Sequence, residues 1–266
     1  MHNAAFAAAG IDAEYVIAEI DEPDVAPAVA AARWPEYLGL GVTAPYKPLV
    51  ASLVDEVEGD ARTIGAVNNV VRTDGGRLIG FNTDAPGFRV GIELAMGRPL
   101  DGAEVVVGGA GGAAHAVVFA CLTAGARRVT IANRTVTTAT RLLERFAGVG
   151  TAERAAMPLD GPDVIDALQT ADVAVNATTI GMVDPRAPFD VQVLPSDATV
   201  FDLVYVPAET PLVAAARARG LRAANGSEML IAQAAIAFER WTGVGGMAHV
   251  MRAAVAPLLA DPAVRA

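Results

Sequence analysis

Short runs of β-branched residues alternate with longer alanine-rich stretches through the middle of the chain. This alternation predicts parallel strands joined by helices. The strands are expected at residues 104–107, 128–132, 172–176, 200–205 and 221–224. The helices are expected at residues 112–124, 137–146 and 211–219, and Gly220 ends the last of them. The pattern therefore predicts a doubly wound α/β sheet from about Asp84 to Asn225.

The first 84 residues follow a different pattern, which predicts a separate α/β unit. A helical opening precedes a strand at 14–20, a helix at 26–33 and a strand at 38–43. Strand-like runs at 66–71 and 77–81 flank Thr73-Asp74-Gly75-Gly76, where glycine can adopt the positive φ that a hairpin turn needs. Two helices, at 228–241 and 247–259, close the chain.

Composition limits the classes of partner. The chain has 266 residues, of which 53% are hydrophobic and 19% charged, as expected of a globular protein with two cores. A net charge of −10 repels phosphate backbones and anionic lipid surfaces, so we expect neither nucleic acid nor membrane partners. The single cysteine, Cys121, cannot form an internal disulfide, and no signal-peptide pattern opens the sequence, which favours a cytoplasmic location.

One uncharged segment, residues 105–126, approaches the length of a membrane span. Four glycines near its middle divide it into a short valine strand and an alanine-rich helix. We therefore expect a soluble strand, turn and helix here.

The turn inside this segment carries candidate cofactor chemistry. Gly109, Ala110, Gly111, Gly112 and Ala113 follow a strand and open a helix, as the dinucleotide-binding fingerprint requires. Small residues let a pyrophosphate approach the backbone, and the helix N-terminus attracts its charge. A tight turn with glycines for packing alone is the weaker interpretation.

The next predicted strand ends at Asn133-Arg134-Thr135, where NAD enzymes place an acid for the ribose 2′-hydroxyl. No acid is present, and Arg134 can pair with a 2′-phosphate while Asn133 and Thr135 donate hydrogen bonds. A solvated arginine beside a helix cap at Thr135 is the alternative, but the position favours NADP. Further cofactor contacts are expected at Thr178, Met182, Val204 and Gly226.

Polar residues also gather at predicted strand ends outside the nucleotide-binding region. They are Thr43 and Lys47 in Gly41-Val42-Thr43-Ala44-Pro45-Tyr46-Lys47, Asn68 in Gly65-Ala66-Val67-Asn68-Asn69, and Asp84 in Asn82-Thr83-Asp84. Gln233 is a further candidate, within a predicted late helix. Singly, each has an ordinary interpretation: a solvated lysine, a turn former, a helix cap, an exposed amide. In series with Gly109-Ala110-Gly111-Gly112-Ala113, Asn133-Arg134-Thr135 and Asp202-Leu203-Val204-Tyr205, these segments resemble the shikimate dehydrogenase family over nearly the whole chain.

The resemblance implies a fold, a reaction and roles for particular residues. It implies an NADP-binding Rossmann domain at 85–225, a substrate domain at 1–84 completed by helices at 226–266, and an active site in the cleft between them. It implies reversible NADPH-dependent reduction of 3-dehydroshikimate to shikimate, a step of chorismate and aromatic amino acid biosynthesis. It places the catalytic pair at Lys47 and Asp84, and it places substrate contacts at Thr43, Asn68, Tyr205 and Gln233.

Several departures from the family pattern leave alternatives open. Gly41 replaces a usual asparagine or serine, and Ala85 a frequent glycine. The family's first strand and Ser-x-Ser-Pro turn are absent, so we expect either a natural start upstream of Met1 or weak binding of the acid substrate. Quinate or an aminated shikimate analogue is an alternative substrate, although Arg134 argues against an NAD-preferring quinate enzyme.

A non-catalytic NADP-binding homologue is the second class of function, which the joint presence of Lys47, Asp84, Asn68 and Gln233 disfavours. The histidines lie far apart in the sequence, so we expect no metal site. The sequence does not decide whether the chain forms a homodimer.

Overall fold

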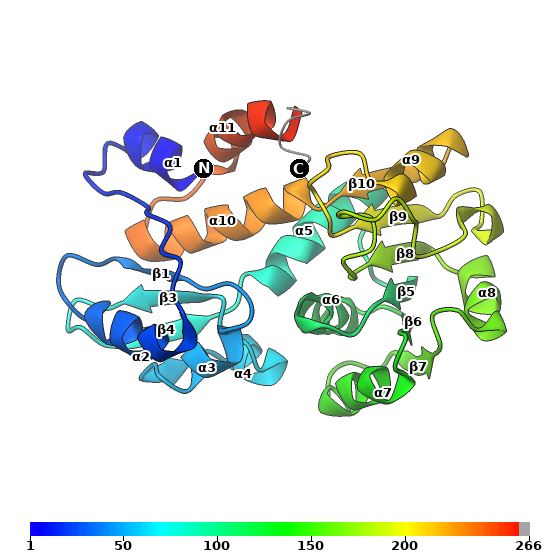
Figure 1. The fold of residues 1–266 in the computed structure, drawn as a ribbon, viewed down its shortest axis with the longest axis horizontal. Helices are drawn as coiled ribbons and strands as arrows, with labels where there is room; N and C mark the ends of the chain where they lie inside the picture. Colours follow the sequence, from blue (N-terminus) through cyan, green and yellow to red (C-terminus); the bar gives the residue numbers. More distant parts are fainter. Residues whose placement is uncertain (261–266) are drawn as a thin grey trace. The chain divides into compact units, whose positions relative to one another are not determined.

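The computed structural model describes residues 1–260. The chain divides into two compact units. One contains Met1–Pro86 and Ile231–Val255, and the other contains Gly87–Leu230 and residues 256–260 (Figure 1). We call them the first unit and the second unit.

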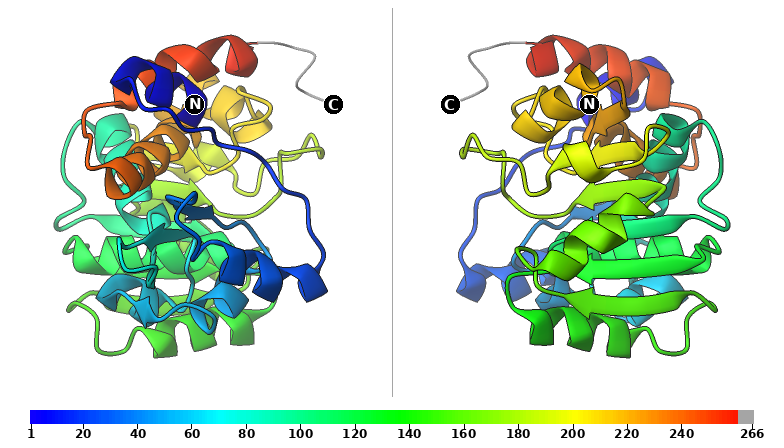
Figure 2. Two further views of the ribbon diagram at one scale, coloured as in Figure 1. Left: turned by 90° about the vertical axis from the view of Figure 1, so that its left-hand side faces the viewer. Right: turned by 90° about the vertical axis from the view of Figure 1, so that its right-hand side faces the viewer.

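A six-stranded parallel sheet forms the centre of the second unit. Its strands lie side by side in the order β10-β9-β8-β5-β6-β7 (Figure 2). They are β5 (Glu104–Gly108), β6 (Arg128–Ala132), β7 (Glu153–Met157), β8 (Val173–Asn176), β9 (Thr199–Asp202) and β10 (Arg222–Asn225). The chain adds β6 and β7 on one side of β5 and then returns to place β8 on the other side. The carboxyl ends of β5 and β8 therefore meet where the strand order reverses, which is the usual ligand position in such sheets.

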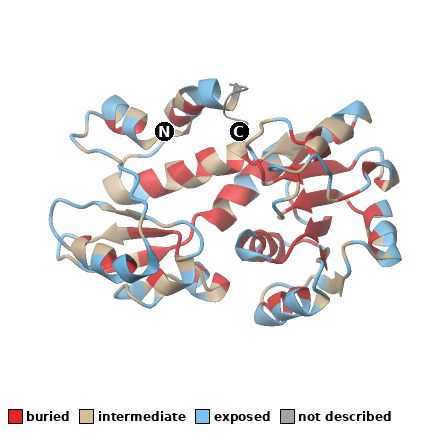
Figure 3. Cartoon of the chain, viewed as in Figure 1, coloured by how far each residue is buried: buried red, intermediate tan, exposed pale blue. Residues whose placement is uncertain are grey.

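Helices connect and cover these strands. They are α5 (Asp84–Met96), α6 (Gly112–Thr123), α7 (Val136–Arg145), α8 (Pro162–Gln169) and α9 (Pro211–Ala218), with a short helical turn η1 (Val191–Val193). The helix α6 packs on β5 and β6, and most of its side chains are buried (Figure 3). Cys121 lies fully buried in α6, and burial raises the pKa of its thiol to about 12.

The first unit contains a smaller, mixed sheet in the order β1-β3-β4-β2. Its strands are β1 (Gly39–Gly41), β2 (Glu56–Val57), β3 (Asn69–Arg72) and β4 (Leu78–Phe81), and only β2 and β4 pair in parallel. The predicted hairpin joins β3 to β4, and Gly76 supplies its positive φ of 76°. This register sets Asn69, the first residue of β3, opposite Phe81 on one side and Gly41 on the other.

Six helices contribute to the first unit. They are α1 (His2–Ala9), α2 (Glu22–Ala31), α3 (Lys47–Ala51), α4 (Gly59–Ile64), α10 (Ser227–Thr242) and α11 (Ala248–Ala260). A core of aliphatic side chains from α2, α3, α4, β3 and β4 packs together, with Val70 and Leu78 among its fully buried members. The helix α10 is attached to the sheet by Trp241, whose indole N–H donates to the Val70 carbonyl at 2.9 Å.

Two strand predictions fail in opposite ways. Residues 14–20 form no strand, and Ile17 in this segment is 86% exposed. No described strand lies beside the segment to form hydrogen bonds with its backbone, and β-branched residues alone do not make a strand. The strand β7 and the following helix α8 form although the sequence interpretation left them out. Strand β7 reads Glu-Arg-Ala-Ala-Met, without the β-branched residues that identified its neighbours, and it pairs only with β6 at the sheet edge.

Among residues 1–260, no helix is both long and apolar enough to cross a membrane.

Candidate functional site

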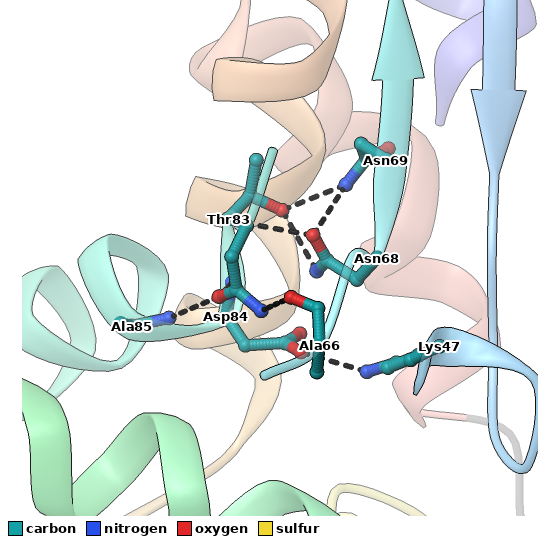
Figure 4. A network of polar contacts seen from close by, with 8 residues as sticks. Lys47, Ala66, Asn68, Asn69, Thr83, Asp84 and Ala85 are labelled. Atoms are coloured by element: carbon teal, nitrogen blue, oxygen red, sulfur yellow. Dashed lines mark hydrogen bonds and ion pairs between the residues drawn. The ribbon is translucent and has the colours of Figure 1, made fainter. Parts of the chain in front are cut away.

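The first unit holds an ion pair between Lys47 and Asp84. The Lys47 ammonium donates to the Asp84 Oδ2 at 2.7 Å (Figure 4). The two side chains are 24% and 11% exposed, so the pair is partly shielded from water but still reachable by a ligand. Asp84 Oδ1 accepts no hydrogen bond within the described chain, and two of the three hydrogens of the Lys47 ammonium form none there either. The pair can therefore both donate to and accept from a bound molecule.

Lys47 is the only lysine in the chain, since the other nineteen Lys and Arg residues are all arginine. A guanidinium stays protonated at any ordinary pH, whereas a lysine ammonium is a compact charge that can release its proton. A chain that uses arginine at every other basic position thus keeps an ammonium at the one position that faces Asp84. This composition favours proton chemistry over simple charge pairing at Lys47.

Asn82 fixes the segment that carries Asp84. Its Oδ1 accepts from the backbone N–H groups of Asp84 and Ala85 at 3.0 and 3.2 Å, so Asn82 caps helix α5. Asp84, considered as a possible cap in the sequence, lies instead in the first turn of that helix, where the helix dipole stabilises its carboxylate. The Asn82 amide also donates to the Ala66 carbonyl at 3.0 Å, which joins this segment to the one before β3.

Asn68, Asn69 and Thr83 form a buried amide and hydroxyl cluster beside the ion pair (Figure 4). Asn68 donates to Thr83 Oγ1 at 3.1 Å and accepts from the Thr83 backbone N–H at 2.8 Å. The Val67 N–H donates to the Lys47 carbonyl at 3.1 Å, so the start of α3 is tied to the same segment. The structure thus brings Lys47, Asn68 and Asp84 together from three separate parts of the sequence.

The other two expected substrate contacts of the first unit are open to ligands. Thr43 is exposed in the loop before α3, and its hydroxyl has no partner among residues 1–260. Gln233 is half-buried on α10, and its side-chain amide also has no partner within the described chain. Neither side chain is committed to the fold.

In the second unit, the glycine turn after β5 has the geometry of the dinucleotide fingerprint. Gly109 adopts a φ of 102°, and a Cβ there would lie 2.9 Å from the Thr178 methyl and 3.0 Å from the Ala177 carbonyl oxygen. A Cβ at Gly111 or Gly112 would meet no protein atom within 4 Å, so the backbone at the start of α6 is open on the ligand side. Ala110 is buried, whereas Ala113 is exposed. The turn therefore fits a pyrophosphate on the helix N-terminus.

A buried polar network supports the loop beside this turn. Asn176, at the end of β8, accepts from the Thr178 N–H and hydroxyl at 3.0 and 2.6 Å, and it donates to Asp202 at 2.8 Å. Asp202 also accepts from the Thr210 hydroxyl at 2.6 Å and from the Val204 N–H at 3.0 Å. Burial raises the pKa of Asp202, although these three hydrogen bonds act to lower it.

The expected 2′-phosphate contacts lie at the end of β6. Arg134 is exposed and forms no ion pair within the described residues, so its guanidinium is available to a ligand. The Asn133 amide donates to the Thr135 carbonyl at 2.9 Å and fixes this turn, and Thr135 occupies the N-cap position of α7 without a side-chain cap bond. No acidic residue intervenes between β6 and α7.

The remaining expected residues of the second unit differ in their access. Met182 is 47% exposed and Tyr205 38%, so both can contact ligands. Val204 is buried and offers a ligand no side-chain surface. Gly226 is also buried, and a Cβ there would lie 2.2 Å from the Leu203 carbonyl oxygen, so the fold itself requires glycine at this position.

Sequence reasoning gave no role to Asn69, Thr83 or Asp202. A signal for Asp202 was present, because an aspartate inside an apolar run is rarely buried without a partner. The pairing of Asn69 with Thr83 depends on the register of β3 and β4, for which residue spacing gave no signal. Within residues 1–260, no three His, Cys, Asp or Glu side chains gather as around a metal ion.

Three family models match separate parts of the chain. Residues 1–70 match the shikimate dehydrogenase substrate binding domain, residues 93–182 match the shikimate / quinate 5-dehydrogenase family, and residues 226–256 match the shikimate 5′-dehydrogenase C-terminal domain. Together they cover more than half of the chain.

Individual relatives agree over nearly full length. The shikimate dehydrogenase (NADP(+)) of Carboxydothermus hydrogenoformans is 41% identical over 96% of this chain and 90% of its own length. The structure of Thermus thermophilus shikimate 5-dehydrogenase in complex with NADP(H) and shikimate superposes with a TM-score of 0.84 at 35% identity, over 96% of this chain and 92% of that one. The Corynebacterium glutamicum quinate dehydrogenase in complex with NAD gives a TM-score of 0.88 at 35% identity, with the same coverage of both chains. The chain belongs to the shikimate dehydrogenase family.

Proposed function

We propose that this protein catalyses the reversible NADP-dependent interconversion of shikimate and 3-dehydroshikimate. The observation that carries the proposal is the 2.7 Å ion pair between Lys47 and Asp84 in a member of this family. Oxidising a secondary alcohol removes a hydride from carbon and a proton from oxygen, so the site needs a polar group that handles the proton. The nicotinamide of NADP(H) supplies the hydride chemistry.

Lys47 and Asp84 divide the proton work between them. In the direction of reduction, Lys47 donates to the oxygen that develops negative charge as the ketone becomes an alcohol. Asp84 Oδ2 holds the ammonium in place, while Asp84 Oδ1 is free to accept from a substrate hydroxyl. In the reverse direction Lys47, as the neutral amine, accepts the hydroxyl proton while the hydride leaves the carbon, and Asp84 Oδ2 holds the ammonium that forms.

The substrate hydroxyls and carboxylate require further contacts. We assign them to Asn68, Thr43 and Gln233 in the first unit and to Tyr205 in the second. The support is that Thr43 and Gln233 have unpaired polar groups, that Asn68 keeps one amide hydrogen, and that the Tyr205 side chain is exposed.

NADP is the better fit for the cofactor than NAD. The exposed Arg134 guanidinium can form a charge-assisted contact with a 2′-phosphate, and no nearby carboxylate would repel that group. We place the pyrophosphate at Gly109 to Ala113, where the open backbone lets a charged group approach the start of α6. Thr178 and Met182, after β8, are assigned to the remainder of the cofactor.

The first experiment is a steady-state assay of the unmodified protein with shikimate, quinate and an aminated shikimate analogue, each with NADP+ and NAD+. The highest kcat/KM is expected for shikimate with NADP+. Preference for quinate or the amine would correct the substrate and leave the reaction class intact. Absence of turnover with all six pairs would refute the proposal and favour a non-catalytic NADP-binding role.

The second experiment uses the single lysine. Lys47→Met should lower kcat by roughly two to four orders of magnitude, the scale of a positioned acid or base, with NADP+ affinity unchanged. Lys47→Arg keeps the charge but not the transferable proton, so it should lower kcat nearly as much. Full activity of Lys47→Arg would show that only charge is required.

We further propose a cytoplasmic location, which suits a chain whose one thiol is buried in the core, and assembly as a homodimer. Cell fractionation and sedimentation of the purified protein test these two statements. A monomer or a larger assembly, or recovery from an oxidising compartment, would overturn the corresponding one.

A further inference from the structure

Asn69 begins strand β3 and is 7% exposed, so its side chain is buried. It donates to Asn68 Oδ1 and to Thr83 Oγ1, each at 3.0 Å (Figure 4). We propose that Asn69 is a positioning residue, which fills the acceptor sites of Asn68 and Thr83 so that Asn68 presents only an N–H donor to the substrate. This inference rests on the proposed function for its substrate.

The hydrogen bonds of Asn68 can be counted completely. A carbonyl oxygen has two lone pairs, and Asn68 Oδ1 accepts from the Thr83 N–H at 2.8 Å and from Asn69 at 3.0 Å. Its amide nitrogen has two hydrogens, of which one goes to Thr83 Oγ1 at 3.1 Å. One amide hydrogen of Asn68 remains for a ligand, and no acceptor remains.

The same count constrains Thr83. Its hydroxyl oxygen accepts from both asparagine amides, so both lone pairs are used and its own hydrogen must point away from them. Thr83 is also fully buried, so it acts as a fixed anchor for the two amides. Without Asn69, Thr83 Oγ1 regains a lone pair and Asn68 Oδ1 regains one as well. The Thr83 hydroxyl can then rotate toward Asn68, and the direction of the remaining Asn68 N–H is no longer fixed.

Fixing that direction matters because of the neighbouring charges. Lys47 offers donors and Asp84 offers an acceptor, and they already hold each other at 2.7 Å. A donor-only Asn68 can bind a substrate hydroxyl only through the oxygen, which leaves the hydroxyl hydrogen for an acceptor such as Asp84. The cluster thereby selects one orientation of a hydroxyl group, and this selection should appear mainly in substrate affinity.

Strand β3 supplies a matched control. Side chains alternate across a strand, and Val70, the next residue, is fully buried in the aliphatic core of the first unit. Val70→Ala should destabilise this unit by leaving a cavity while the amide cluster stays intact. Comparing it with Asn69→Leu, which has similar size and branching but no donors, separates loss of stability from loss of positioning.

The expected kinetic result is a split between KM and kcat. Asn69→Leu should raise KM for shikimate about tenfold, which corresponds to roughly 1.4 kcal/mol, with kcat and the KM for NADP+ nearly unchanged. Val70→Ala should lower the thermal midpoint without raising KM for shikimate. If Asn69→Leu changes no kinetic parameter, or if Val70→Ala raises KM as much, Asn69 has only a structural role and the inference is wrong.

A second measurement does not depend on the substrate. In isotope-labelled protein, the Asn68 amide hydrogen that is bonded to Thr83 Oγ1 should exchange with water slowly. Asn69→Leu, which lets the Thr83 hydroxyl rotate, should accelerate that exchange about tenfold or more, while Val70→Ala should not. Unaltered exchange in Asn69→Leu would overturn the inference even if shikimate is turned over. Accelerated exchange in a protein that does not turn over shikimate would refute the proposed substrate and support the role of Asn69.

Discussion

Gly109 is the position in the cofactor turn where the fold itself excludes a side chain. It has a φ of 102°, and a Cβ would lie 2.9 Å from the Thr178 methyl and 3.0 Å from the Ala177 carbonyl oxygen. Gly109→Ala therefore forces an alanine into a backbone region that costs about 1–3 kcal/mol and pushes against the loop after β8. A loss near 2 kcal/mol should lower the thermal midpoint by roughly 4–8 °C.

Gly111 and Gly112 have different surroundings and therefore a different expected result. No protein atom lies within 4 Å of a Cβ at either position, and Gly111 has a φ of −82° that any residue adopts. Gly112→Ala should fold with an unchanged or slightly higher thermal midpoint, because Gly112 begins α6 and alanine favours helices by up to about 1 kcal/mol over glycine. Gly111 is the N-cap of α6 with an extended backbone, so Gly111→Ala should fold with a nearly unchanged thermal midpoint. Their methyl groups would nevertheless occupy the approach of the pyrophosphate, so the Kd for NADP+ should rise at least about tenfold, near 1.4 kcal/mol.

Thermal melting without cofactor and fluorescence titration with NADPH separate the two requirements. Gly109→Ala is expected to lose stability first, and Gly111→Ala is expected to lose affinity alone. The reasoning is refuted if Gly109→Ala has the same thermal midpoint as the unmodified protein. It is equally refuted if Gly111→Ala and Gly112→Ala both bind NADPH as tightly as the unmodified protein.

Two other perturbations test the charges. Arg134→Ala should weaken NADP+ binding by roughly ten- to a hundredfold, about 1.5–3 kcal/mol, and NAD+ binding far less, and equal weakening of both in paired titrations would exclude the phosphate contact. Burial, with a smaller contribution from the N-terminal ammonium, lowers the pKa of His2 to about 4. Between the folded pKa and the unfolded pKa of about 6.5, His2 is neutral in the folded protein but protonated in the unfolded chain. The free energy of unfolding is therefore highest above the unfolded pKa and should fall by about 2 kcal/mol from pH 8 to pH 5. His2→Phe keeps an aromatic ring against Tyr15 and Trp241 but cannot be protonated, so it should remove this decrease in the free energy of unfolding. Urea titrations at pH 8 and pH 5 measure the decrease, and an equal decrease in His2→Phe would show that His2 does not cause it.

The sequence predicted the second unit well because strands buried on both faces read as continuous apolar runs. Strand β5 contains such a run at Val105 to Val107, β6 contains the β-branched run Val129 to Ile131, and each strand was placed to within one residue. The edge strand β7 lacks such a run. The segment 14–20 has one but finds no partner, because strand formation depends on a neighbour that a local pattern does not specify.

The site was predicted as a set of residues rather than as a geometry. Lys47 and Asp84 were identified from the family resemblance, yet their contact spans 37 positions and depends on the capping of α5 by Asn82. For Val204 and Gly226, the residue type is already explained by the fold, because the Val204 side chain is buried and the backbone around Gly226 leaves no room for a Cβ.

The buried Cys121 gives the protein an internal reporter. It is the only thiol in the chain and its pKa is about 12, so a thiol-alkylating reagent finds almost no thiolate while α6 stays packed on the sheet. Each alkylation event therefore records an opening of the second unit, and the labelling rate measures how often that opening occurs. Because a ligand that binds only the closed form makes opening rarer, NADP+ should slow the labelling in proportion to its occupancy. The stabilisation of the second unit by bound NADP+ can thus be measured without any turnover.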